Sequence, residues 1–276
     1  MPPAIVASTL AAAATSAPEL SVGVNSALAG TPQISIGDAL GSNVVNLGLI
    51  LGVALVIGDM PATRKDARRT YATAALAPIA TAALLIHGDL GRPQAIGLFG
   101  LFFAWLASSV IDARRFRAHA TPRRTDSGAR IVAMLVLGLA AMVGGGHLIV
   151  EGAAAVAASW GIDGFIIGAL IVAIGTSTPE LAVTIVSRLR GHGEISLATL
   201  LGSNIFNGLF IVPTVGLIQP VALPLDEVLP ALAFGLIAVA LCHPDRSEKL
   251  VRWRGLLLIT VYLGFIIAIV PSWVAP

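Results

Sequence analysis

Nine long apolar stretches take up most of this 276-residue chain and constrain its fold more than any other feature. Each is close to the roughly 20 residues that a helix needs to cross a bilayer. Charged residues make up only 12% of the chain, about half the share in soluble domains, which excludes a soluble enzyme. The stretches do not alternate between polar and apolar residues, which excludes a closed β-barrel. We therefore expect an all-α polytopic membrane protein with about nine transmembrane helices, at residues 3–28, 36–58, 70–87, 95–112, 130–158, 163–187, 195–218, 223–242 and 254–274.

The basic residues indicate which side each connection faces. All but Arg92 of the 17 Lys and Arg residues follow the second, fourth, sixth or eighth stretch, and nine crossings place these connections on one side. This side is predicted to be cytoplasmic, in the inner (plasma) membrane, with the amino terminus cytoplasmic and the carboxyl terminus external. We interpret the basic stretch 113–130 as a topology signal, with binding to anionic membrane lipid as an alternative. The clusters lie between apolar runs and do not indicate a nucleic-acid partner.

An internal repeat recurs at an offset of 161 residues. The block at 15–20 (TSAPEL) recurs at 176–181 (TSTPEL), and the block at 41–46 (GSNVVN) recurs at 202–207 (GSNIFN). The helix that holds the first copy is predicted to start on the cytoplasmic side and the helix that holds the second on the external side, so the repeats are inverted across the membrane. Inverted repeats that meet near the bilayer midplane are typical of transporters.

We expect the first inverted repeat, with a cytoplasmic linker, at 1–128 and the second at 129–276. Met1 pairs with Ile162 at this offset, so the stretch at 130–158 has no counterpart in the first repeat. We expect an upstream segment of about 30 residues that holds a Gly-rich apolar span with an acidic residue near its end. A functional nine-span protein is the alternative. An in-frame stop immediately upstream would exclude the extra span.

The repeated blocks place carboxylates and prolines deep in apolar segments. A charge such as Glu19 or Glu180 at the bilayer centre costs about 2.5–3.5 kcal/mol on insertion scales, so such residues usually face a cavity or a partner. Pro18 and Pro179 interrupt the helical hydrogen bonds and free nearby carbonyl groups. Free carbonyls at membrane depth are tolerated beside a polar cavity or an ion. The blocks therefore predict a buried polar site.

Hydroxyl and amide side chains lie three or four residues from one another within these blocks, on shared helix faces. The donors are oxygen atoms, which suit calcium and sodium, whereas copper and zinc favour His or Cys. We expect the transported ions as the ligands and no cofactor. The candidate ion ligands are Thr15, Ser16, Glu19, Ser42, Asn46, Thr176, Ser177, Glu180, Ser203 and Asn207.

These blocks resemble the two alpha repeats of the sodium/calcium exchanger family, within the cation/calcium antiporter superfamily, over nearly the whole chain. The resemblance implies alternating access, with sodium and calcium competing for one cluster made of the ten residues above. Relatives usually have ten spans, whereas nine are predicted here. The span without a counterpart in this sequence is the first helix of the family. Asn207 stands where many relatives carry aspartate, and Ala14 where glycine is usual. With Asn46 and Asn207 neutral, we expect only two carboxylates at the site, altered ion coupling and no support for potassium dependence.

The expected function is secondary active exchange of Ca²⁺ for Na⁺, and not an enzymatic reaction. The alternatives are a Ca²⁺/H⁺ antiporter and a truncated, non-transporting membrane protein or partner subunit, with a cation channel less favoured. No phosphate-binding motif supports pumping by ATP. Asp38 follows an external turn, where we expect it to attract cations at the entrance or to be a solvated acid at a helix start. The oligomeric state, stoichiometry and direction of transport are left open.

Overall fold

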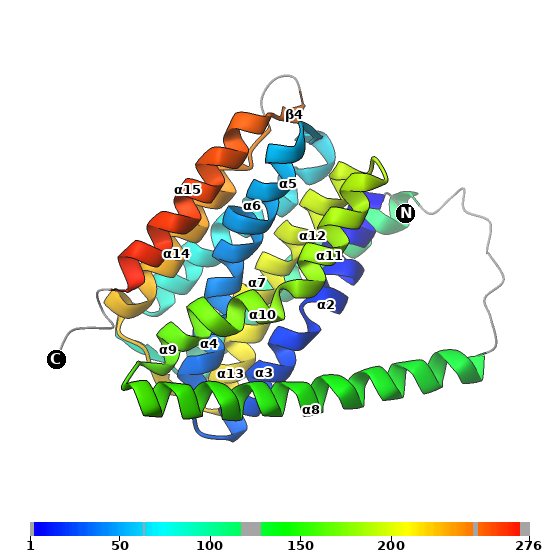
Figure 1. The fold of residues 1–276 in the computed structure, drawn as a ribbon. Helices are drawn as coiled ribbons and strands as arrows, with labels where there is room; N and C mark the ends of the chain where they lie inside the picture. Colours follow the sequence, from blue (N-terminus) through cyan, green and yellow to red (C-terminus); the bar gives the residue numbers. More distant parts are fainter. Residues whose placement is uncertain (1–2, 63, 117–127, 245–247, 271–276) are drawn as a thin grey trace.

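The computed structural model describes residues 3–62, 64–116, 128–244 and 248–270, which fold into a bundle of helices with two short β pairs (Figure 1). The segments labelled η are π-helical. The first half contains α1 (Pro3–Val6), η1 (Ala7–Ala11), α2 (Ala12–Thr15), α3 (Ala17–Leu28), α4 (Pro32–Val44), η2 (Val45–Leu51), α5 (Gly52–Ile57), β1 (Met60–Pro61), α6 (Arg64–Leu84), β2 (Asp89–Leu90) and α7 (Arg92–Phe116). The second half contains α8 (Gly128–Trp160), α9 (Gly164–Ile167), η4 (Gly168–Val172), α10 (Ala173–Thr176), α11 (Thr178–Leu189), α12 (Gly193–Phe206), η5 (Asn207–Ile211), α13 (Val212–Ile218), β3 (Val221–Ala222), α14 (Leu225–Leu241), β4 (Lys249–Leu250) and α15 (Arg252–Ile269).

Each of the nine predicted apolar stretches coincides with one helix or with a run of consecutive helical segments, which confirms the all-α prediction. Four helical runs of the described residues are long and apolar enough to span a membrane, and a bent pair raises this number to five. Two of the remaining stretches are too short as continuous helices, since the first is interrupted at Ser16 and α14 has only 17 residues. The four runs are Pro32–Ile57, Arg92–Arg114, Gly193–Ile218 and Arg252–Ile269, and the bent pair is Gly164–Thr176 with Thr178–Leu189.

The two halves run in opposite directions. The chain passes from α2 to α3 toward the end of the bundle that α8 covers, and from α9 through α10 to α11 toward the opposite end (Figure 1). The π-helical segments also recur at the offset of 161, since η1 and η4 cover equivalent residues. The internal repeat is therefore a structural one, and its predicted inversion is confirmed.

The repeats interlock through close helix contacts at equivalent glycines. A Cβ atom on Gly41 would lie 2.4 Å from the carbonyl oxygen of Ala169, and one on Gly202 would lie 2.2 Å from that of Ser8. Ala169 and Ser8 are themselves separated by 161 residues. Thus α4 packs on η4 and α12 packs on η1, so that each Gly-Ser-Asn helix lies against the helical run that precedes the Thr-Ser-x-Pro-Glu break of the other repeat.

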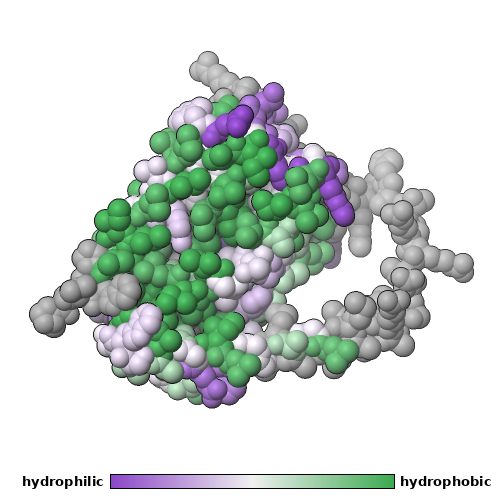
Figure 2. Space-filling model, in the orientation of Figure 1, coloured by the Kyte–Doolittle hydropathy of each residue, from purple (hydrophilic) through white to green (hydrophobic). Residues whose placement is uncertain are grey.

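Basic residues from separate connections gather at the end of the bundle that holds β1 and β4. The Arg188 guanidinium donates to the carbonyl of Asp59 over 2.8 Å, and the Arg252 backbone N–H donates to the Asp59 carboxylate over 2.9 Å. Polar surface covers this end, whereas apolar surface covers most of the visible flank (Figure 2). Arg92 lies at the other end, where its Nε donates to the carbonyl of Leu217. Most of the basic stretch 113–130, which we interpret as a topology signal with lipid binding as the alternative, lies outside the described residues.

The helix α8, which we expected to span the membrane at 130–158, lies across the other helices instead of along them (Figure 1). It packs mainly against α3. Gly146 allows this approach, because a Cβ there would lie 2.2 Å from Ser21 Oγ. The hydropathy of the stretch predicts the helix, but the direction of the helix depends on this contact.

Candidate ion-binding site

The Thr-Ser-x-Pro-Glu blocks break their helices at equivalent serines. Ser16 (φ −83°, ψ 13°) and Ser177 (φ −77°, ψ 7°) leave the helical region, and a proline lies in the first turn of the helix that follows each. Proline fits this first turn because its missing N–H has no helical partner there. The second break bends its helix pair by 41°. The predicted interruption is confirmed in both repeats.

The carbonyl groups near the two breaks are not equivalent. In the second repeat, Thr178 Oγ1 donates to the carbonyl of Gly175 over 2.8 Å. The equivalent of Thr178 is Ala17, which has no hydroxyl to offer to Ala14. This side-chain partner is therefore specific to the second repeat.

All ten predicted ligands are buried, none with more than 7% of its surface exposed. Four of them form a cluster that we call the Glu180 group: Glu180, Ser16, Ser203 and Thr15. The hydroxyls of Ser16 and Ser203 donate to Glu180 Oε1 over 3.2 and 3.1 Å, and Thr15 Oγ1 lies 3.3 Å from Ser203 Oγ. The group combines both repeats, as the predicted interface requires.

A second cluster, the Asp38 group, consists of Asp38, Ser42 and Thr176. Thr176 Oγ1 donates to Asp38 Oδ1 over 2.7 Å, and Ser42 Oγ lies 3.4 Å from the same atom. Ser42 Oγ also lies 3.5 Å from Thr176 Oγ1 and from the carbonyl of Ala173. The Asp38 side chain is fully buried, so the prediction of a solvated or entrance acid is wrong. A third buried carboxylate also corrects the expectation of only two.

The site holds buried oxygen atoms that make no hydrogen bond within the described structure. A buried charge is costly unless it is paired or binds a metal ion. Glu19 interacts electrostatically with Glu180 and Asp38, so the carboxylates repel one another and would be stabilised by a cation. The unpartnered atoms are both carboxylate oxygens of Glu19, Asp38 Oδ2, Glu180 Oε2, Ser177 Oγ, Asn46 Oδ1, and both Asn207 amide atoms.

The described residues include no group of three or more His, Cys, Asp or Glu side chains that could hold one metal ion. A cation here would therefore need hydroxyl, amide or carbonyl oxygens beside its carboxylates. Such mixed oxygen donors are the usual environment of calcium. The arrangement fits the predicted chemistry of the ten residues.

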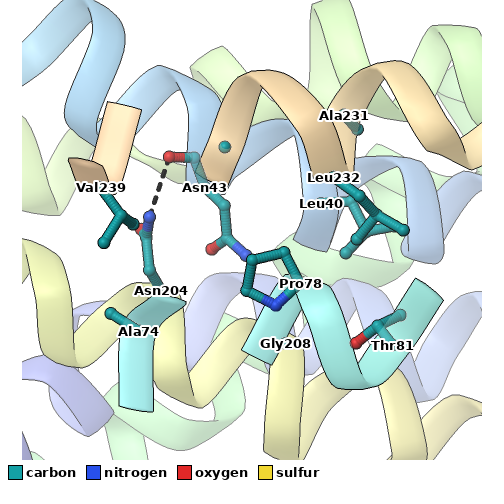
Figure 3. A pocket seen from close by; sticks show the side chains of 11 residues that line it. Leu40, Asn43, Ala74, Pro78, Thr81, Asn204, Gly208, Ala231, Leu232 and Val239 are labelled. Carbon is teal, nitrogen blue, oxygen red and sulfur yellow. Dashed lines mark hydrogen bonds between the residues drawn. The ribbon is translucent and has the colours of Figure 1, made fainter. Parts of the chain in front are cut away.

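An amide network joins the repeats beside the site. Asn46 Nδ2 donates to Asn204 Oδ1 over 3.1 Å, and Asn204 Nδ2 donates to the backbone carbonyl of Asn43 over 2.9 Å. Figure 3 shows the second of these bonds at a pocket lined by α4, α6, α12 and α14, where Pro78 lies next to Asn43. We did not single out Asn43 and Asn204 from the sequence, although they are equivalent positions of the Gly-Ser-Asn blocks. The network fixes the Asn46 side chain by a hydrogen bond, whereas the side chain of its equivalent Asn207 makes no hydrogen bond among the described residues.

Inverted helical repeats around buried carboxylates are the architecture of a secondary transporter. The chain belongs to the sodium/calcium exchanger family, since the family described as "Sodium/calcium exchanger protein" matches residues 1–111 and 130–270. This match confirms the family that the repeated blocks indicate.

Individual relatives resemble nearly the whole chain. Inner membrane protein YrbG of Escherichia coli is 31% identical over 292 residues, which cover 100% of this chain and 88% of YrbG. The sodium/calcium exchanger MaX1 of Methanosarcina acetivorans is 27% identical over 309 residues, which cover 96% of this chain and 88% of MaX1. A solved structure of the sodium–calcium exchanger NCX_Mj, soaked with Na⁺ and Sr²⁺, aligns with a TM-score of 0.73 and 27% identity, covering 96% of this chain and 86% of that one.

Proposed function

We propose that this chain is a secondary active antiporter that exchanges Ca²⁺ for Na⁺ by alternating access. The observation that carries the proposal is a set of fully buried carboxylates with unpartnered oxygens between two inverted repeats. Family membership supports the same class of transported ion. The ten residues predicted from the sequence are the proposed ligands.

In the proposed mechanism, Ca²⁺ binds carboxylate oxygens from both repeats together with neighbouring hydroxyl and carbonyl oxygens. Na⁺ uses the same hard oxygen donors, so the two ions compete for them. Helix breaks at Ser16 and Ser177 give each repeat a point where its two helical halves can change their relative angle. Opposite directions of the repeats then allow the site to open to one side at a time.

The proposed setting is the inner (plasma) membrane, with repeats at 1–128 and 129–276. We assign the end that holds β1, β4, Arg188 and Arg252 to the cytoplasm, because basic connections are retained on that side. The pairing of β2 with β3 marks the external end.

Uptake of radioactive calcium into proteoliposomes that contain the full chain tests this proposal. We expect an outward Na⁺ gradient to drive uptake, and equal Na⁺ on both sides to abolish it. A pH gradient without Na⁺ should drive no uptake. Uptake driven by the pH gradient alone would instead identify a Ca²⁺/H⁺ antiporter. No uptake under either gradient would favour a non-transporting protein.

We expect Asn207→Asp to preserve transport and to make it more sensitive to pH. The new carboxylate would replace a buried amide whose polar atoms are unpartnered, so no hydrogen bond described in the structure is lost. A carboxyl group that is protonated no longer offers a charge to a cation, so transport by the variant should fall more steeply as the pH decreases. The measurement is the pH profile of Na⁺-driven calcium uptake. An unchanged profile would indicate that position 207 does not contact the ions.

A further inference from the structure

We propose that Asp38 is a third acidic ligand of the transported cations, supplied at a position that has no acidic counterpart in the other repeat. This inference rests on the proposed function and deepens it. It adds a residue to the ten predicted ligands and makes the two halves of the site chemically unequal.

The surroundings of Asp38 are those of an ion ligand. Its side chain is fully buried, and its described hydrogen bonds come from two hydroxyls, those of Thr176 and Ser42. Both hydroxyls already belong to the predicted ligand set. None of the ion pairs among the described residues involves Asp38. A buried carboxylate without a basic partner is expected to bind a cation or to lose its charge.

Hydrogen-bond accounting at the Asp38 group leaves room for a cation. Each hydroxyl has one hydrogen to donate, and it keeps two lone pairs as acceptors. Thr176 lies within reach of Asp38 and of the carbonyl of Val172, and Ser42 within reach of Asp38 and of the carbonyl of Ala173. The carbonyl of Ala173 already accepts from the Ser177 backbone N–H, so both hydroxyl hydrogens can go to Asp38, where both approach Oδ1. Asp38 Oδ2 makes no hydrogen bond in the described structure, which leaves an anionic oxygen for an ion.

Asp38 differs from Glu19 and Glu180 in that it is not repeated in the other half of the chain. The residue 161 positions after Asp38 is Thr199, a buried and neutral residue. Thr15 and Ser203 associate with Glu180, whereas their equivalents Thr176 and Ser42 associate with Asp38 and not with Glu19. Glu19 keeps both of its oxygens unpartnered. The site thus contains three buried carboxyl groups, one in each hydroxyl cluster, with Glu19 close enough to interact electrostatically with both of the others.

Three carboxylates would give the ionised site a charge of minus three before a cation binds. One bound Ca²⁺ neutralises two of the three carboxylates, and the third charge is available for a monovalent cation. Loss of the Asp38 charge should therefore weaken the binding of Ca²⁺ and also reduce the ability of Na⁺ to displace it. Removal of one charge a few ångströms from a buried ion should raise the half-saturating Ca²⁺ concentration by about tenfold or more.

The test compares Asp38→Asn and Asp38→Thr with the unaltered full chain in detergent. Threonine is the residue at the equivalent position of the other repeat, where the fold accommodates it. The matched control is Asp89→Asn, which removes a carboxylate from an exposed residue of β2. Binding of radioactive calcium at equilibrium, displacement of calcium by Na⁺ and the melting temperature are measured for each protein.

We expect both Asp38 variants to melt near the temperature of the unaltered chain, to bind Ca²⁺ about tenfold or more weakly, and to require more Na⁺ for displacement. The control should bind as the unaltered chain does. Unchanged binding in both variants would overturn the assignment of Asp38. Failure of both variants to fold would show a structural role instead and would also overturn it. If the unaltered chain binds neither Ca²⁺ nor Na⁺, the proposed function itself fails.

Discussion

Replacing Glu19 with glutamine should abolish calcium transport while the chain remains folded. Both carboxylate oxygens of Glu19 are buried without a hydrogen-bond partner among the described residues, so the substitution breaks no described hydrogen bond and removes only a charge. At short range in a site of low polarity, that charge is worth several kcal/mol to a bound cation, which corresponds to at least about a hundredfold in affinity. Calcium uptake into proteoliposomes and the elution profile of the purified variant measure the two effects.

The equivalent substitution Glu180→Gln should also abolish transport, but with some loss of stability. Glu180 Oε1 accepts hydrogen bonds from Ser16 and Ser203, which would be weaker to a neutral amide. The control is Glu151→Gln, since the Glu151 side chain is 64% exposed on α8. Normal transport by both site variants would refute the proposed ligands.

The second large effect is expected at the glycines that hold the repeats together. Gly41→Ala or Gly202→Ala would drive a methyl group into the backbone of the opposite repeat, at distances that no Cβ atom tolerates. Overpacking of a core typically costs 1–3 kcal/mol, and backbone atoms cannot rotate away, so we expect about 3 kcal/mol and a clearly lower melting temperature.

The control for these variants is Gly100→Ala in α7, where a Cβ meets no atom within 4 Å. It should melt at or above the temperature of the unaltered chain, because alanine favours the helix over glycine. If Gly41→Ala and Gly202→Ala melt like this control, the helices are not packed as closely as the structure shows.

Much of the site can be predicted from the sequence because its residues recur in both repeats. Two blocks in register at one offset identify Glu19, Glu180 and their neighbouring hydroxyl and amide residues without any knowledge of the fold. The prolines likewise locate the helix breaks from local chemistry alone. All nine predicted stretches are helical, since long apolar runs are the strongest signal that a sequence carries.

Asp38 shows what local reasoning misses. We treated it as an acid near a helix start, but α4 begins at Pro32 and carries Asp38 well inside the bundle. Its shortest hydrogen bond comes from Thr176, which lies 138 residues away in the chain. A weaker signal was present, because Asp38 precedes Ser42 by four residues and so shares a helix face with it. Asp38 has no acidic match in the other repeat, because its counterpart is Thr199.

The direction of α8 shows a different limit. Hydropathy identifies a helix at 130–158 but contains no information about its angle to the bundle, which depends on packing against α3. The unequal use of Asn46 and Asn207 is also invisible in the sequence. The same residue type at equivalent positions becomes bonded in one repeat and unpartnered in the other only through the tertiary contact with Asn204.

The central claim is that Ca²⁺ and Na⁺ compete for one buried site between the repeats. The most direct measurement is a Na⁺ titration of radioactive calcium bound to the purified full chain. The account predicts that Na⁺ displaces all the bound calcium, that an equal concentration of choline displaces none, and that Glu19→Gln abolishes the calcium binding. Calcium that stays bound at saturating Na⁺, or that binds the Glu19 variant as tightly as the unaltered chain, would contradict a shared site.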